Sequence, residues 1–328
     1  MSFSVCYDGG SDSIQMRDYY KTAIKDLLRE NSRVVVGEAD NGFGMYGWEY
    51  FELKKTYGDR FIDVGIQEAN LIGIAAGLSV TGKIPYVHAF LPFITRRVFD
   101  TLFISLAYAG LNARIYGSDP GINAALNGGT HMSFEDIGLL RTIPGITIVD
   151  VTDGVMLDFL LRDTADKYGL YFFRGYRSKE PVRIYGEGST FAYGRANLLR
   201  EGRDVTIIAC GIMAAKALQA AKLLENKGIS ARVVDIFTIK PIDENYIVSC
   251  AKDTGAIVTA ENHRTSTGLA SAVADILISA GIACAFEKIG VGEEFGQVGS
   301  EDFLAQRYKL TAEDIAGKAE IAICKKRF

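Results

Sequence analysis

The sequence predicts an α/β protein of two domains, each with a parallel sheet covered by helices on both faces. Three observations indicate this fold. At 328 residues the chain is too long for one ordinary hydrophobic core. Short β-branched runs alternate with stretches whose apolar residues recur at helical spacing. The alternation lapses over 181–204, where turns and short strands are expected, and then resumes. We therefore expect domains at 1–185 and 190–328.

The elements of the first domain follow in order from these patterns. The β-branched run at 32–40 ends in turn residues and predicts a buried strand, and the preceding segment 16–29 predicts a helix. Small residues at helical period in 69–82 predict a helix that packs closely on its neighbours. The other expected elements are strands at 83–90, 112–118, 146–153 and 169–175 and helices at 93–110 and 154–168.

The second domain is expected to repeat this alternation over a shorter length. Its predicted strands are 205–211, 230–237, 255–262 and 284–291, and its predicted helices are 214–228, 243–252 and 268–281. Strands separated by helices pair in parallel, and open sheets of this kind bind ligands at the carboxyl ends of their strands.

Composition excludes several classes of function. The formal net charge is -4 with acidic and basic residues interleaved, so no nucleic-acid surface is predicted. The amino terminus lacks the features of a signal peptide, and every apolar run is broken before a membrane span could form. Five scattered cysteines have no CxxC or metal-ligand spacing, and the three histidines lie far apart. We expect a cytoplasmic protein that binds neither nucleic acid nor membrane.

Several common catalytic motifs are absent from the sequence. No GxGxxG follows a strand and no GxxxxGK[ST] occurs, so neither phosphate-binding loop is present. The GxSxG nucleophile elbow of many hydrolases is also missing.

Spaced motifs along the chain resemble one family, the transketolases. DVGIQEANLIGIAAGLSVTGKIPYVHAFLPFITRRVFDTL (63–102) is similar to their pyrimidine-binding domain, and GGTHMSFEDIGLLRTIPGITIVDVTDG (128–154) continues the similarity. DIFTIKPID (235–243) and TAENHRTSTGLASAVADIL (259–277) resemble their C-terminal domain. The chain looks most like the C-terminal half that split-gene transketolases encode separately. The resemblance implies a pyrimidine domain with a six-stranded parallel sheet, a transketolase C-terminal α/β domain, and thiamine diphosphate as cofactor.

Glu68 stands at the start of the small-residue helix, where burial of an unpaired carboxylate would be costly. The resemblance implies that Glu68 is catalytic and binds the cofactor. In the family this glutamate hydrogen-bonds a ring nitrogen of the aminopyrimidine and favours the tautomer that removes the thiazolium proton. Such a pair is strong where water is excluded. The alternative is a glutamate that only stabilises the first turn of its helix.

Further residues match cofactor contacts of the family. Phe90 and Phe93 fall where relatives stack aromatic rings on the pyrimidine, although both could be core residues. Arg96 occupies a position that is often aromatic, and Arg97 matches a family arginine. Asp40 follows a strand and matches an acid close to the cofactor, although aspartate is also ordinary in a turn.

His131 matches the histidine that, in many relatives, contacts the substrate at the reacting carbon. As the only histidine beside a glycine-rich loop at a strand end, it is also the best candidate for proton transfer. His263, in the ENH motif, is similar to the family but fits a structural or interface role equally well. His88 is interpreted as a packing residue.

Substrate contacts differ from those of sugar-phosphate transketolases. Asn127 replaces an aspartate that recognises a sugar hydroxyl. Asp119 replaces a phosphate-binding histidine and would repel a phosphate dianion. Gly44 stands in place of a phosphate-contacting serine. Arg17 and Arg177 match arginines that suit anion binding, although each could form a surface ion pair. We therefore expect a non-standard sugar substrate.

The chain lacks the GDG motif that marks the metal and diphosphate site of the family. A diphosphate needs a divalent cation with oxygen ligands. The resemblance therefore implies that an N-terminal transketolase subunit holds Mg²⁺, or another divalent cation, and that this chain has no metal site. Two cofactor sites at a two-fold interface imply an α2β2 heterotetramer.

The expected reaction is transfer of a two-carbon ketol unit from a ketose to an aldose, with activity only beside the partner subunit. Two other enzymes are considered, the beta subunit of a 2-oxo acid dehydrogenase and a deoxyxylulose phosphate synthase-like enzyme. The FTIKPID and ENH motifs favour transketolase over the former, and the short chain argues against a complete synthase. A non-catalytic regulatory partner of a thiamine enzyme is the alternative from another class, and retention of Glu68, Phe93 and His131 argues against it.

Overall fold

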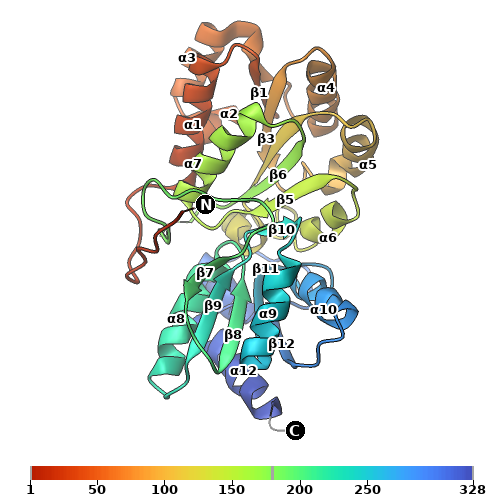
Figure 1. Ribbon diagram of the computed structural model, residues 1–328. Helices are drawn as coiled ribbons and strands as arrows, with labels where there is room; N and C mark the ends of the chain where they lie inside the picture. The colour runs from red at the N-terminus through yellow and green to blue at the C-terminus, as the bar shows by residue number, and fades with distance from the viewer. Residues whose placement is uncertain (1, 179–180, 327–328) are drawn as a thin grey trace.

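The computed structural model describes residues 2–178 and 181–326, and its two sheets form the upper and lower halves of Figure 1. The first sheet has the strand order β10-β5-β6-β4-β3-β1-β2. Six of its strands pair in parallel, the number that the resemblance implied, although the residue pattern predicted only five and missed the strand at 61–63. These strands are β1 (Val34–Glu38), β2 (Phe61–Asp63), β3 (Ile84–Phe90), β4 (Ala113–Ser118), β5 (Ile146–Asp150) and β6 (Leu170–Gly175).

The seventh strand comes from the other half of the chain. β10 (Thr238–Lys240) pairs antiparallel with β5, with Thr238 opposite Val149. The resemblance implied only six strands, and three residues inside the DIFTIKPID motif are too few to show a period of two. β10 therefore ties the C-terminal half to the first sheet.

The second sheet has the order β12-β11-β8-β9-β7, and all its pairs are parallel except β7 with β9. The α/β class predicted for this half is confirmed. Its strands are β7 (Asn197–Arg200), β8 (Val205–Ala209), β9 (Ala231–Asp235), β11 (Ala256–Arg264) and β12 (Ala285–Val291).

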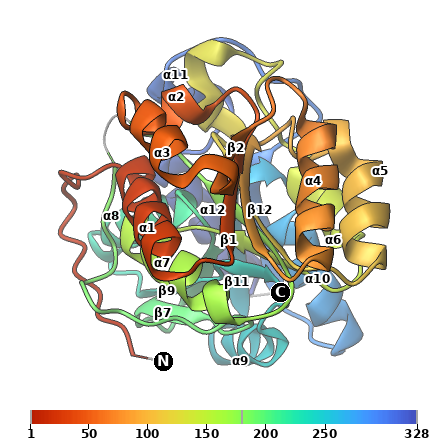
Figure 2. The same cartoon turned by 90° about the horizontal axis from the view of Figure 1, so that it is seen from above.

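Helices cover both faces of the two sheets. From above, α1 (Met16–Glu30) and α7 (Gly154–Asp163) lie on one side of β1, and α4 (Glu68–Val80) lies on the other (Figure 2). Two buried apolar clusters, one on each side, run through both halves. The first takes in α1, α7, α8 (Met213–Glu225) and α12 (Ala312–Lys325), and the second takes in α4, α6 (Asp136–Arg141), α9 (Glu244–Thr254) and α10 (Leu269–Ser279).

Some helical segments differ from the sequence prediction. The helix expected over 93–110 is divided into η2 (Arg96–Val98), α5 (Phe99–Thr101) and the π-helical η3 (Leu102–Tyr108). Other helices were not predicted, most of them because they are short, whereas α12 was missed although its buried residues from Ala312 to Ala322 recur at helical spacing. These are α2 (Gly42–Tyr46), α3 (Glu49–Tyr57), η4 (Gly121–Asn127), α6, α11 (Glu301–Arg307) and α12, with the single turns η1 (Gly58–Arg60) and η5 (Thr164–Asp166).

Arg174 of β6 is fully buried where the two halves meet. Its Nε lies 2.5 Å from Oδ2 of Asp136, and its Nη1 lies 2.7 Å from Oδ2 of Asp150. Its Nη2 also donates to the carbonyl of Asn262, in β11, at 3.3 Å. Burial opposes the charge on Arg174, but the two carboxylates outweigh it and raise its pKa. One charged guanidinium therefore joins β6 to β5, α6 and β11.

Replacing Arg174 by methionine should lower the free energy of unfolding by about 3–5 kcal/mol, because two buried carboxylates lose their cation. Urea unfolding measures this loss. Arg200→Met is the matched control, since its ion pair with Glu225 is partly exposed to solvent. Equal losses for the two variants would contradict a structural role for the Arg174 ion pairs.

Candidate active site

Most residues singled out in the sequence lie at one edge of the first sheet. Asp40 follows β1, Phe90 ends β3, Asp119 follows β4 and Arg177 follows β6. These strands are parallel, so their carboxyl ends meet at the same edge. Glu68 reaches this edge as well, because it begins α4 after the turn that leaves β2.

Glu68 is only 2% exposed although it is the first residue of its helix. Its Oε2 accepts a hydrogen bond from Nη1 of Arg97 at 2.7 Å. In the described part of the chain, the carboxylate accepts no hydrogen bond from a backbone amide of α4, although Glu68 is the acidic residue of the first turn, as the helix-stabilising alternative requires. The Arg97 guanidinium also lies 4.1 Å from the centroid of the Phe93 ring. Arg97 thus connects the buried carboxylate to the aromatic residues beside it.

Phe90, Phe93 and His131 form an aromatic corner next to Arg97. The two phenylalanine rings are 6.3 Å apart at 83°. The His131 ring lies 5.5 Å from Phe90 and 5.1 Å from Phe93, in both cases edge to face. All three side chains are partly exposed, so neither phenylalanine is a core residue. The corner can present ring faces to a flat heterocycle.

Three predicted site residues lie farther from this corner. Arg96 pairs with Glu135 at 2.8 Å and donates to the carbonyl of Thr130, so it touches the segment that carries His131. Asp40 is exposed and has a left-handed φ of 60°. Asn127 is exposed at the end of η4.

A small cavity of about 70 Å³ adjoins the aromatic corner through Phe90. Arg17, Gly44, Asp119 and Arg177 line it together, and we name it the anion pocket. Asn127 is not among its lining residues. The structure therefore brings together four of the six positions that the sequence associates with substrate, while His131 belongs to the adjoining aromatic corner. The remaining lining residues are Asn41, Met45, His88, Tyr116, Ser118 and Tyr176.

Asp119 is 3% exposed, and its Oδ2 lies 3.4 Å from Nη2 of Arg177. Burial raises the pKa of this carboxyl to about 6, against the lowering effect of Arg177, His88 and Arg17. Above that pH, two arginine cations face one carboxylate in the anion pocket. Asp119 also holds a left-handed φ of 60°, a strained conformation for a residue other than glycine and one that concentrates at functional sites.

His88 forms part of the pocket wall, which the packing interpretation of the sequence missed. Its Nδ1 lies 2.7 Å from Oε2 of Glu38, and its Nε2 lies 3.1 Å from Oγ of Ser118. Burial raises the pKa of Glu38, and the contact with His88 opposes that rise. The one signal in the sequence was spacing, since His88 and Phe90 point to the same side of β3.

The ENH motif has structural contacts in the described residues. The Glu261 carboxylate accepts from the backbone amides of Leu269 and Ala270 at the start of α10, at 2.7 and 2.8 Å. Nε2 of His263 accepts from the amide of Ile137 at 3.1 Å. Burial lowers the pKa of His263 to about 4, so the neutral ring can accept this bond. These contacts favour the structural alternative for His263.

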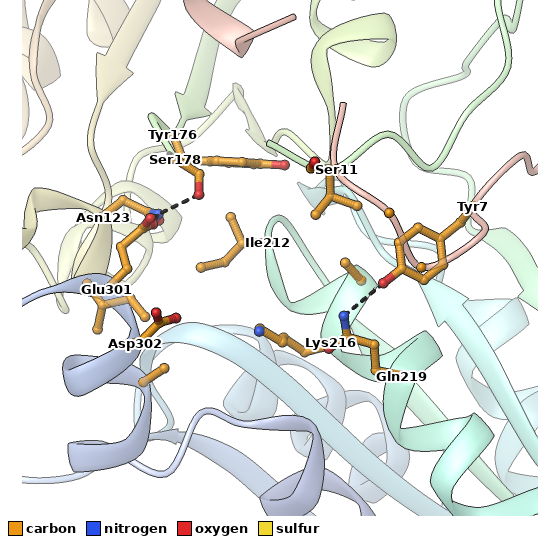
Figure 3. A pocket seen from close by; sticks show the side chains of 16 residues that line it. Tyr7, Ser11, Asn123, Tyr176, Ser178, Ile212, Lys216, Gln219, Glu301 and Asp302 are labelled. Carbon is orange, nitrogen blue, oxygen red and sulfur yellow. Dashed lines mark hydrogen bonds between the residues drawn. The ribbon is translucent and has the colours of Figure 1, made fainter. Parts of the chain in front are cut away.

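A larger cavity of about 180 Å³ lies between the two halves (Figure 3). Glu301 of α11 accepts a hydrogen bond from Oγ of Ser178 at 2.9 Å and another from the side-chain amide of Asn123. Tyr176 lines both this cavity and the anion pocket. The C-terminal half therefore contacts the segment that leads to His131.

The donor set fits one half of the cofactor that the resemblance implies. A buried carboxylate beside two aromatic rings suits an aminopyrimidine, whose ring nitrogen can share a proton with Glu68. Among residues 2–178 and 181–326, no cluster of three or more His, Cys, Asp or Glu could hold a metal ion. Over the same residues, no helix is long and apolar enough to cross a membrane.

Comparisons with known proteins identify the family of this chain. Residues 12–179 match the transketolase pyrimidine binding domain, and residues 194–315 match the transketolase C-terminal domain. A solved split-gene transketolase, described as an inactive beta4 tetramer, superposes with a TM-score of 0.86 and 37% identity. The superposition covers 96% of this chain and 100% of that one.

Two subunits of specialised transketolases are similar over nearly their whole length. The 6-deoxy-6-sulfo-D-fructose transketolase subunit SqwH of Clostridium sp. (strain MSTE9) is 42% identical, covering 95% of this chain and 96% of the relative. One subunit of the apulose-4-phosphate transketolase of Phocaeicola vulgatus is 31% identical, covering 94% of this chain and 97% of the relative. The chain therefore belongs to the transketolase family, as the C-terminal subunit of a split transketolase that is active with a partner subunit.

Proposed function

We propose that this subunit, with its partner, transfers a two-carbon ketol unit from a ketose whose far end carries one negative charge, as a sulfonate does. The observation that carries the proposal is the anion pocket, where Arg17 and Arg177 face Asp119. The relative of 42% identity is named for a sulfonated fructose, which supports the same class of substrate here.

The charges of the anion pocket favour a monoanion over a dianion. Two arginines can bind the sulfonate oxygens while Asp119 stays ionised, because positive and negative charges then balance. A phosphate ester is largely dianionic at neutral pH, since its second pKa is about 6. With Asp119 ionised, a dianion would leave a negative charge in excess next to a buried carboxylate. Asn127, exposed beside the site, is proposed to contact a sugar hydroxyl.

The residues of the aromatic corner are proposed to bind thiamine diphosphate, which supplies the electron sink of the family's chemistry. Glu68 shares a proton with the aminopyrimidine, and Phe90 and Phe93 orient that ring and exclude water. His131, edge-on to both rings, moves a proton at the substrate oxygen next to the reacting carbon.

Two other residues are proposed to support the cofactor. Asp40 and Arg96 stand at the margin of the site, where they contact the bound cofactor once the partner closes over it. Both are exposed in this chain, so a contact with the cofactor would not displace any core residue.

The diphosphate and its divalent cation are assigned to an N-terminal subunit that carries a GDG motif. This assignment rests on the sequence given, which contains no GDG motif. We propose an α2β2 heterotetramer located in the cytoplasm. Residues 1–185 would form the cofactor half-site, and residues 190–328 would form the C-terminal domain.

The purified chain alone should bind thiamine diphosphate weakly and should have no transketolase activity, because it lacks the cation site. Calorimetry with thiamine diphosphate and Mg²⁺ tests the binding, and an assay of the chain with and without its N-terminal partner tests the activity. Tight, magnesium-dependent binding to the isolated chain would exclude a shared site. Native mass measurement of the complex tests the assembly, and one copy of each subunit would exclude the heterotetramer.

Replacing Glu68 by glutamine or alanine should lower kcat of the assembled enzyme by roughly 100-fold or more, the usual scale for lost proton-transfer groups. Glu49→Ala is the matched control, because Glu49 is also the first residue of a helix, α3, but is paired with Lys25 on the surface. Its kcat should stay near wild type. If Glu68→Gln retains kcat within about threefold, Glu68 has no part in cofactor activation.

Asp119 should set the preference between sulfonated and phosphorylated donors. With 6-deoxy-6-sulfofructose and fructose 6-phosphate as a matched pair, Asp119→Asn should raise kcat/KM for the phosphate relative to the sulfonate by roughly tenfold. In the wild type, this ratio should rise as pH falls through about 6, where Asp119 becomes neutral.

Asp119→Asn also serves as the control for pH, because the phosphate itself titrates in the same range. Any pH dependence of the donor ratio that remains in Asp119→Asn is caused by titration of the phosphate. The difference between the profiles of the variant and the wild type is caused by titration of Asp119. Identical pH profiles of the donor ratio in the two proteins would refute the charge-matching role of Asp119.

A further inference from the structure

The substrate loop, residues 119–135, joins β4 to α6 and carries His131. Its backbone is strained at two residues other than glycine, with φ of 60° at Asp119 and 45° at Ala125. Such conformations persist only where the surroundings hold them. The partners that hold the loop therefore decide where the His131 ring lies.

The first part of the loop is held by Asn262 of β11. Oδ1 of Asn262 accepts from the amide of Ile122 at 3.1 Å. Its Nδ2 donates to the carbonyl of Pro120 at 3.0 Å and to Oδ1 of Asn123 at 3.1 Å. Asn262 is 2% exposed, so water does not compete for these bonds.

The second part of the loop is in close contact with residues 292–299, a segment of the C-terminal half. A Cβ added to Gly129 would lie 2.2 Å from the carbonyl oxygen of Gly296. A Cβ added to Gly296 would lie 2.6 Å from Sδ of Met132, and one added to Gly128 would lie 2.7 Å from the Val298 side chain. The two segments meet backbone to backbone, with no room for a methyl group.

Hydrogen bonds from other residues of the C-terminal half hold the segment 292–299. Nη2 of Arg264 donates to the carbonyl of Glu294 at 3.2 Å, and the Tyr308 hydroxyl donates to the carbonyl of Phe295 at 2.8 Å. The backbone amide of Arg264 also donates to the carbonyl of Phe134 in the substrate loop, at 3.0 Å. Contacts from β11 and from residues 292–299 therefore reach the loop on both sides of His131.

We propose that the C-terminal half acts in catalysis by setting the conformation of the substrate loop, with Asn262 and Gly296 as positioning residues for His131. Neither residue needs to touch the substrate. A shift of the loop by a fraction of an ångström moves the His131 ring relative to Phe90 and Phe93, and misplacement by about 1 Å can cost on the order of 100-fold in rate. The inference rests on the proposed role of His131.

Gly296→Ala tests the proposal in the complex of this chain with its N-terminal partner. The added methyl must displace Met132 or the loop, so kcat should fall about tenfold or more while KM and cofactor affinity stay within about twofold. Gly292→Ala is the matched control. It lies in the same segment, but its added Cβ meets nothing within 4 Å, and its kcat should match wild type.

A double-mutant cycle separates positioning from general damage. In the His131→Ala background, Gly296→Ala should cause no further loss of kcat, because its effect acts through His131. An equal loss in both backgrounds would overturn the proposal, and so would a Gly296→Ala variant with the kcat of Gly292→Ala.

The role of His131 and the positioning inference can fail separately. If His131→Ala lowers kcat and Gly296→Ala does not, only the positioning inference is wrong. If His131→Ala keeps the wild-type kcat, the role of His131 is wrong and the inference falls with it. Should Gly296→Ala fail to assemble, Asn262→Asp tests the other contact. It keeps the shape and the acceptor for Ile122 but turns both donors into acceptors, so an assembled variant with unchanged kcat would also overturn the proposal.

Discussion

The position of the site depends on the buried ion pairs of Arg174. A buried guanidinium needs partners for its charge and its N–H groups, and for Arg174 the carboxylates of Asp136 and Asp150 are the principal ones. Three residues after Arg174 the chain places Arg177 in the anion pocket, and Asp136 marks the end of the substrate loop. The same guanidinium contacts the carbonyl of Asn262. The Arg174 guanidinium therefore holds the end of β6, the end of the substrate loop and the C-terminal half in place relative to one another.

The two halves of the chain contribute to the site in different ways. The first sheet brings charged and aromatic side chains to a common edge, because parallel strands end on the same side. The C-terminal half supplies none of the residues proposed to touch cofactor or substrate. Its buried side chains and glycine contacts instead support the loop that carries His131. This division of roles gives a physical reason for the ENH motif, whose polar atoms are occupied by backbone groups of the molecule itself.

The feature of the anion pocket that bears on substrate choice is its balance of charges rather than its shape. A buried aspartate between arginines is costly unless a ligand or the arginines compensate it, and its pKa of about 6 reflects that compromise. In the proposed function, Arg17 and Arg177 attract the anionic end of the substrate, and Asp119 limits the charge that the pocket accepts. Selectivity of this kind depends on a repulsive group as much as on attractive ones.

The sequence by itself determined the α/β class and the parallel pairing of strands in the first sheet, because alternation is a local pattern, and its motifs singled out Glu68 as a candidate. Only the tertiary structure decided which side chains meet. Arg97 reaches Glu68 across 29 residues, and Asn262 reaches Ile122 across 140, so neither contact leaves a periodic trace. The three-residue β10 and the wall position of His88 were missed for the same reason. A periodic pattern along the chain predicts which face of a helix or strand is buried. Which distant residues come into contact depends on how the helices and strands pack against one another.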